Sequence, residues 1–191
     1  MNTTKLVRNV RLAGIAGVAT LALAMAAIAL ADEITCNGGK CNGTQFDDTI
    51  IGSNKKDGIK AKAGNDEVYA QKGNDIVELG AGNDYIEGGR GDDTISGGDD
   101  SDEFLIGGLY GGPGDDTVEG GEGNDDVYGD GGKDVLLGGP GDDQLVGSGA
   151  EPGDDGAKDR LTCGPGNDTA IVSLNDKVDQ SCEEVIPERR R

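Results

Sequence analysis

An aliphatic residue recurs every nine positions along most of this chain, and small and acidic residues fill the positions between. The segment from Ala61 to Ser96 reads AKAGNDEVY, AQKGNDIVE, LGAGNDYIE and GGRGDDTIS. Each nine has Gly at place four, Asp at place six and an aliphatic residue at place eight. A period of nine is too short for a helical repeat, so each unit is predicted to be one turn followed by one short strand.

The same period gives thirteen units between residues 43 and 171. Because side chains alternate along a strand, place eight points away from places seven and nine, and we expect it to face inward. Two units then make one coil, with strands in two parallel sheets and turns along two edges. The sequence therefore predicts an all-β fold, a parallel β-roll (two-sheet β-solenoid). The residues at place eight are Ile50, Ile59, Val68, Val77, Ile86, Ile95, Phe104, Val118, Val127, Leu136, Leu145, Leu161 and Ala170.

Two segments interrupt the period, and both are predicted to be surface insertions, which loops tolerate better than strands do. The first adds five residues at 106–110, and the second adds seven at 147–153. A passive bulge is the main interpretation of the first, and an apolar contact through Leu109 and Tyr110 is the alternative. Residues 32–42 are predicted to cap the roll, and residues 172–191 to form one or two closing strands and a tail.

Residues 1–31 are predicted to be a signal peptide. Three basic residues precede a nearly uninterrupted apolar run from Leu12 to Leu30, and Ala29-Leu30-Ala31 fits a cleavage site before Asp32. The predicted location is therefore extracellular, with no stable membrane insertion after cleavage. An uncleaved anchor is the alternative, because the run is nearly long enough to span a bilayer.

Four cysteines follow the leader, and an exported chain meets an oxidising environment that favours disulfides. Four cysteines permit three pairings. The local pairs Cys36 with Cys41 and Cys163 with Cys182 are favoured, because each would staple one end of the array. A zinc site is the alternative, but the chain has no His, and the two cysteine pairs are far apart in sequence.

Composition changes the picture in two ways. The chain holds 37 acidic and 17 basic residues, for a net charge of −20, so nucleic acid is excluded as a partner because its phosphates require Lys and Arg. With 36 Gly, no Trp and two Phe, little bulk is present for an ordinary core, and such a composition is typical of disorder. Disorder leaves the fixed register of aspartate and aliphatic residue unexplained, whereas a cation-binding structure explains both.

Aspartates at place six are the candidate metal ligands. Turns of alternate units stack on one edge about 4.8 Å apart, which places Asp66 under Asp84 and Asp116 under Asp134. Stacked carboxylates repel unless a cation lies between them. Calcium takes six to eight oxygens, carboxylate and carbonyl alike, whereas magnesium demands tighter octahedral geometry. The thirteen candidates are Asp48, Asp57, Asp66, Asp75, Asp84, Asp93, Asp102, Asp116, Asp125, Asp134, Asp143, Asp159 and Asp168.

The runs GGRGDDTIS and GGPGDDTVE, with KAGND, QKGND and AGNDY between them, resemble the repeat-in-toxin (RTX) family, also called the hemolysin-type calcium-binding region. The resemblance covers about residues 43–171. It implies a parallel β-roll in which the aspartate at place six ligates calcium. The closing segment CGPGNDTAIVSLNDKVDQSCEEVI is similar to the ends of small exported repeat proteins from Gram-positive bacteria.

The chain departs from the family pattern at four turns. Phe46, Lys55, Asp100 and Ala157 stand at place four, where the family has glycine, so weaker sites are expected at Asp48, Asp57, Asp102 and Asp159. Many members carry an effector domain ahead of the repeats, and here only about a dozen residues separate Asp32 from the first unit.

Calcium binding by an exported, non-enzymatic roll is the predicted function. An enzyme is disfavoured, because the chain has no His and the aspartates are better explained as ligands. A calcium-dependent adhesin that binds a cell-surface or matrix partner is the alternative. An ice-binding roll would need a ladder of Thr, which place three does not supply.

Overall fold

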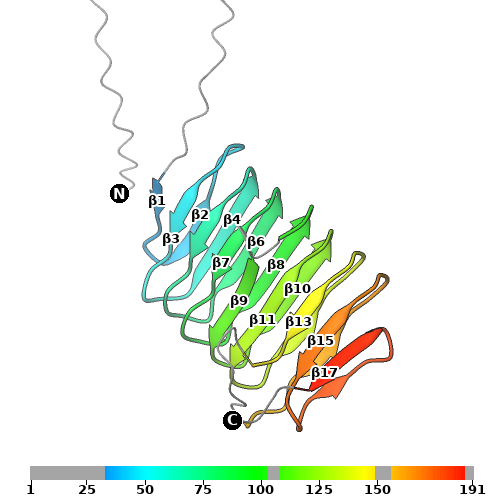
Figure 1. Ribbon diagram of the computed structural model, residues 1–191. Coiled ribbons are helices and arrows are strands. Elements are labelled where there is room, and N and C mark those ends of the chain that lie inside the picture. The colour runs from blue at the N-terminus through cyan, green and yellow to red at the C-terminus, as the bar shows by residue number, and fades with distance from the viewer. Residues whose placement is uncertain (1–32, 103–107, 149–155, 188–191) are drawn as a thin grey trace, which may run out of the picture.

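The computed structural model describes residues 33–102, 108–148 and 156–187 as a stack of strands that runs from β1 to β17 (Figure 1). These residues contain no helix, so no helix among them could span a membrane. The predicted signal peptide lies outside the described residues. The strands are β1 (Glu33–Thr35), β2 (Gly39–Asn42), β3 (Thr49–Ile51), β4 (Asp57–Ala63), β5 (Glu67–Tyr69), β6 (Ile76–Ala81), β7 (Tyr85–Glu87), β8 (Thr94–Asp99), β9 (Gly108–Pro113), β10 (Thr117–Glu122), β11 (Asp126–Gly131), β12 (Val135–Leu137), β13 (Gln144–Val146), β14 (Arg160–Thr162), β15 (Thr169–Val172), β16 (Lys177–Val178) and β17 (Glu184–Pro187).

Strands alternate between two parallel sheets. The odd-numbered strands form a nine-stranded sheet in the order β1 to β17, and the even-numbered strands form an eight-stranded sheet from β2 to β16. In the uninterrupted part, each strand pairs with the strand eighteen residues later, as Ile50 does with Val68. The prediction of an all-β parallel β-roll is thus confirmed.

The core between the sheets consists of the residues at place eight. One column runs through the nine-stranded sheet and the other through the eight-stranded sheet, and every member is at most 1% exposed. Ala61, Ala70 and Leu79, which stand at place one, extend this core. The columns are Ile50, Val68, Ile86, Leu109, Val127, Leu145 and Ala170 in one sheet, and Ile59, Val77, Ile95, Val118, Leu136 and Leu161 in the other.

The structure corrects the position of the first insertion. Leu109 is fully buried and pairs with Ile86 on one side and Val127 on the other, so it fills the core position expected for Phe104. Tyr110 pairs with Tyr128 in the sheet and belongs to no bulge. The extra residues are therefore 103–107 and not 106–110. A strand must run directly into its glycine turn, and Gly111 follows Tyr110 at once.

The second insertion is also displaced by two residues. Gly147 donates its backbone N–H to the Ile171 carbonyl, as Gly138 does to Thr162, so Gly147 takes place one of the turn that ends at Asp159. The additional residues of this turn are 149–155, which lie outside the described residues, and not 147–153. The strands on either side of each insertion keep their pairing.

Disulfides join Cys36 to Cys41 and Cys163 to Cys182, as expected. The first lies beside strands β1 and β2, which cap the N-terminal end. At the other end, two strands beyond the repeats, β16 and β17, pair with β14 and β15 and continue both sheets. Each end of the roll is thus closed by a covalent link between neighbouring segments.

Left-handed backbone recurs in the turns at place two as well as at place four. Six of the thirteen turns carry glycine at both places. Among the others, Lys62, Gln71 and Asp130 at place two adopt φ values of 100°, 76° and 67°. Asp100 at place four adopts 79°, so its turn keeps the common shape without glycine. Non-glycine residues are strained in this region, which makes these four positions local costs to stability.

We predict that Gly82→Ala sharply destabilises the roll. Gly82 has a φ of 137°, and a Cβ there would lie 2.0 Å from the Gly64 carbonyl oxygen of the neighbouring turn. Left-handed strain and the clash together are expected to lower the free energy of unfolding by about 3 kcal/mol or more. Gly131→Ala is the matched control, because nothing lies within 4 Å of a Cβ there. Urea unfolding in calcium should show equal stability for Gly131→Ala and wild type, and equal losses in both variants would contradict the prediction.

Candidate metal-binding turns

All thirteen aspartates at place six are buried, with exposures between 0% and 3%. Successive turns leave the two sheets at opposite edges, so the aspartates form two ladders. One contains Asp48, Asp66, Asp84, Asp102, Asp125, Asp143 and Asp168, and the other contains Asp57, Asp75, Asp93, Asp116, Asp134 and Asp159.

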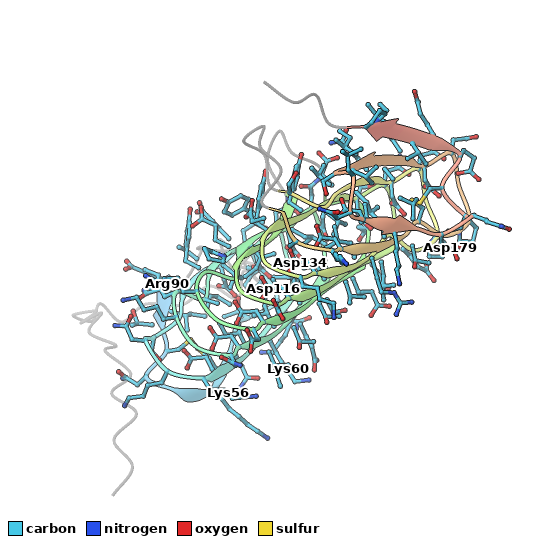
Figure 2. All side chains as sticks on the ribbon, turned by 90° about the horizontal axis from the view of Figure 1, so that it is seen from below. Lys56, Lys60, Arg90, Asp116, Asp134 and Asp179 are labelled. Carbon is cyan, nitrogen blue, oxygen red and sulfur yellow. A yellow bond between two sulfur atoms is a disulfide. The ribbon has the colours of Figure 1, made fainter. Side chains whose placement is uncertain are left out.

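Backbone hydrogen bonds join consecutive aspartates of each ladder. The Asp66 N–H donates to Asp84 Oδ1 at 2.7 Å, and the Asp84 N–H donates to Asp102 Oδ1 at 2.7 Å. Asp116 and Asp134, labelled in Figure 2, are joined in the same way at 2.8 Å. The predicted stacking of turns is therefore present on both edges, and one carboxylate oxygen of each pair is satisfied.

The second carboxylate oxygen lacks a hydrogen-bond partner in many turns. This Oδ2 atom is buried and unpartnered in Asp66, Asp75, Asp84, Asp93, Asp116, Asp143 and Asp168. A buried, unpartnered acceptor is costly, and a buried charge is costlier still. The carboxylates therefore lie in an environment that favours either a proton or a cation at Oδ2.

The pKa values of several buried aspartates are raised, because burial destabilises the charged carboxylate. Burial, with a further contribution from the Asp66 carboxylate, raises the pKa of Asp84 to about 7 from its ordinary value of 3.8. Burial likewise raises the pKa of Asp102 to about 8 and of Asp93 to about 6. The hydrogen bond from the backbone of the preceding aspartate lowers each pKa but does not offset burial.

Backbone carbonyls supply the other oxygens of these turns. The position that a Cβ would take on Gly82 lies 2.0 Å from Gly64 O, and that on Gly91 lies 1.5 Å from Gly73 O. The carbonyl of one turn thus faces the bare glycine of the next, and a side chain there would fill the gap. Carbonyl and carboxylate oxygens are the ligands of a hard cation, and calcium accepts both.

This donor set fits calcium better than a softer metal. The chain has no His, and its four cysteines are all in disulfides. Across the ranges described above, no three acidic, Cys or His side chains converge on one point. Aspartates and glycine carbonyls of neighbouring turns would hold the ion, which would neutralise the stacked carboxylates.

In the first two turns of the roll, residues of the same turn donate hydrogen bonds to the aspartate, although Oδ1 of Asp57 stays buried without a partner. The Ser53 N–H and Oγ–H donate to Asp57 Oδ2 at 2.7 and 2.8 Å. Thr44 donates its backbone N–H and its hydroxyl to Asp48. Donors thus stand where a cation would otherwise be required. This difference agrees with the weaker calcium sites predicted at Asp48 and Asp57, which stay predictions.

Two acidic residues beyond the repeats extend the ladders and were not predicted. Asp159 N–H donates to Asp176 Oδ1 at 3.2 Å, and Asp168 N–H donates to Glu183 Oε2 at 3.0 Å. Asp176 also accepts the N–H and hydroxyl of Ser173, as in the first turns. One sequence feature could have predicted them, namely an acidic residue two places before an apolar one. It occurs in Asp176-Lys177-Val178 and Glu183-Glu184-Val185, but without the glycines that mark the other units.

Fold and turns together define a parallel β-roll whose Gly- and Asp-rich edges suit calcium. A family model described as the RTX calcium-binding nonapeptide repeat matches four times, over residues 42–77, 55–86, 70–104 and 110–148. Together these matches cover more than half of the chain, which therefore belongs to the RTX calcium-binding nonapeptide repeat family. No curated protein matches the chain. Calcium binding through Asp-rich turns follows from this membership.

We predict that protons partly replace calcium. The folded pKa of Asp84 is about 7 and its ordinary value is 3.8, so the folded state binds more protons than the unfolded state between these pH values. Stability of the metal-free roll should therefore rise as the pH falls from 8 to 5. Circular dichroism of protein stripped of metal, titrated from pH 8 to pH 5, would measure this as a gain of β signal at the acid end. A fall in stability over the same interval would contradict the prediction.

Proposed function

We propose that this protein is an exported, non-enzymatic roll in which calcium binding and folding are one event. The observation that carries the proposal is the row of buried aspartates whose Oδ2 atoms have no hydrogen-bond partner, as in Asp84 and Asp116. Calcium would be held by the thirteen aspartates at place six together with carbonyls of the stacked turns. A chain that lacks the ions would carry like charges in a dry environment and would extend.

Energetics support the coupling. Extracellular calcium modules have dissociation constants of about 10⁻⁴ to 10⁻³ M. At about ten times the dissociation constant, each site adds about 1.4 kcal/mol. Roughly five sites would then contribute about 7 kcal/mol, which is comparable to the whole stability of a small domain.

Export is supported by three features of the chain. Residues 1–31 have the pattern of a signal peptide, and two disulfides suit an oxidising compartment. RTX repeat proteins are typically exported, and extracellular calcium is abundant enough to fill weak sites. We infer an extracellular protein, and the resemblance of its closing segment favours a Gram-positive bacterium.

A calcium-dependent adhesin is the second candidate. The roll would then be a rigid support for a contact surface. The outer face of the nine-stranded sheet favours this candidate, because it carries a row of partly exposed tyrosines.

Calcium should induce the fold. Circular dichroism of residues 32–191, titrated from chelator upward, is expected to show a cooperative gain of β signal at sub-millimolar to millimolar calcium. Magnesium at the same concentrations should not produce it, because it retains its waters and demands tighter geometry. Full β signal in chelator at pH 8 would refute the coupling of binding to folding.

Asp84→Asn separates the role of the carboxylate from that of the fold. The amide keeps an oxygen that can accept the Asp66 N–H, but it removes the charge that would bind the ion. We expect the calcium midpoint to rise severalfold. Glu119→Gln is the control, since Glu119 is an exposed acid on the outer face of the eight-stranded sheet and should leave the midpoint unchanged.

Secretion should remove the leader at one bond. Expression of the full chain in a Gram-positive host is expected to release protein whose first residue is Asp32, as read by intact mass. Ala29→Asp and Ala31→Asp should each block processing, because the cleavage site requires small residues. Recovery of the wild-type chain only in membranes, with residues 1–31 attached, would support an anchor instead.

A further inference from the structure

All four tyrosines of the chain form one row on the outer face of the nine-stranded sheet. They lie on four consecutive strands, β5, β7, β9 and β11. Ring centroids of Tyr69 and Tyr85 are 5.9 Å apart, those of Tyr85 and Tyr110 are 5.6 Å apart, and those of Tyr110 and Tyr128 are 4.5 Å apart. The first three are half-buried, so their rings remain accessible.

Neither the core nor the aspartate ladders need these rings. They stand at places seven and nine, which point away from the core. The equivalent place nine of the eight-stranded sheet carries Lys60, Glu78, Ser96 and Glu119, and Lys60 forms a salt bridge with Glu78. Since the fold accepts small and charged residues at this place, the aromatic row on the other face calls for a separate explanation.

A hollow of about 350 Å³ opens beside the middle of the row. Its walls include the rings of Tyr85 and Tyr110, which are inclined at 51° to each other. Bare backbone at Gly88, Gly89 and Gly112 lines it as well. Gly108 makes the arrangement possible, because a Cβ there would come within 3.1 Å of the Tyr110 ring.

Carboxylates surround these rings. Glu87 and Asp130 line the hollow, and Tyr85 donates its hydroxyl to Glu87 Oε1 at 2.6 Å. The pKa of the Tyr110 phenol is raised, first by burial and then by Tyr128, Asp126, Asp130 and Glu87. Among the described residues that line the hollow there is no Lys or Arg. Tyrosine and carboxylate side chains thus line the hollow together, without a basic residue among the lining residues to balance the charge.

We propose that this hollow binds an organic ammonium ion, with the trimethylammonium group as the best fit. In this assignment the two inclined rings in the lining would turn negative faces to the cation, and Glu87 and Asp130 in the same lining would add opposite charge. Calcium is not the occupant, because it requires six to eight oxygens and gains little from ring faces.

Tyrosine fluorescence gives a direct readout, because the chain has no Trp and all its tyrosines lie in this row. The calcium-loaded protein, its fold checked by circular dichroism, is titrated with choline and with 3,3-dimethylbutan-1-ol, the uncharged analogue of the same shape. We expect choline to bind with a dissociation constant of about 0.1 to 10 mM and the neutral analogue at least tenfold more weakly. Equal binding of the two, tighter binding of glucose, or no binding of choline would each overturn the proposal.

Variants locate the site on the roll. Tyr110→Leu and Glu87→Gln should each weaken choline binding by roughly threefold to thirtyfold. Tyr110→Phe keeps the ring face and should bind like wild type, as should Glu119→Gln on the opposite face. Glu87→Gln keeps an acceptor for the Tyr85 hydroxyl, so it remains informative if Tyr110→Leu fails to fold. Unchanged binding in Glu87→Gln together with folded Tyr110→Leu would refute the assignment.

Vesicles distinguish the source of the ammonium group. Co-sedimentation with phosphatidylcholine vesicles, set against phosphatidylglycerol vesicles, tests a lipid headgroup, and choline in solution tests a free solute. We commit to the free solute, because a hollow of about 350 Å³ is of a size for one small organic ion. Sedimentation with phosphatidylcholine that choline cannot compete with would overturn this choice. The proposal requires a folded roll, so a protein that binds no calcium fails at the fold check and not at the choline titration.

Discussion

The hydrogen bond from the backbone of one buried aspartate to the carboxylate of the next fixes the distance and register between coils. It repeats from Asp48 to Glu183 on one edge and from Asp57 to Asp176 on the other. The same carboxylate leaves its second oxygen in a dry place, so the interaction that orders the stack also creates its main electrostatic cost. A cation in the turns removes that cost. The register between coils, the burial of the aspartates and the dependence on a metal ion therefore all follow from this one interaction.

The composition of the chain follows from this constraint. Carbonyl oxygens must approach the next turn closely, which only glycine permits at positions such as Gly82 and Gly91. Glycine therefore makes up much of each coil. Each strand contributes one apolar residue, at place eight, to the core. Low hydrophobicity and high charge, which normally indicate disorder, here describe a fold whose stabilising partner is an ion.

The regular part of this fold could be predicted because its period is set by local chemistry. Because the glycines, the aspartate and the alternation of side chains recur at fixed places, only one alignment of the units is possible. The place-eight residues from Ile50 to Ile95 are buried, as that alignment predicts. Phe104 was wrongly predicted as the core residue because both Phe104 and Leu109 are apolar residues that a strand could contain. Counting two places on from Asp102 selects Phe104. The turn at Gly111 decides between them, since the strand must enter it without a gap.

The remaining misses have related causes. Left-handed backbone at place two is hidden where Lys62 or Asp130 replaces glycine, because the sequence then shows no special residue. Asp176 and Glu183 were missed because their turns contain no glycine at all. The tyrosine row depends on which strands are neighbours in space. Tyr69 and Tyr128 lie 59 residues apart with unequal steps between the four tyrosines, so their meeting follows from the coil and not from any local pattern.

The alternation of strands between the two sheets has a consequence for how such a gene can lengthen. Duplication of a single nine would add one strand and transfer every later strand to the opposite sheet. The core would tolerate the exchange, because place eight faces inward on both sides. The outer surfaces would not, since Tyr110 and Tyr128 would move away from Tyr69 and Tyr85. Inheritance of a patterned surface therefore favours duplications and deletions of eighteen codons, even though the repeat read along the chain is nine.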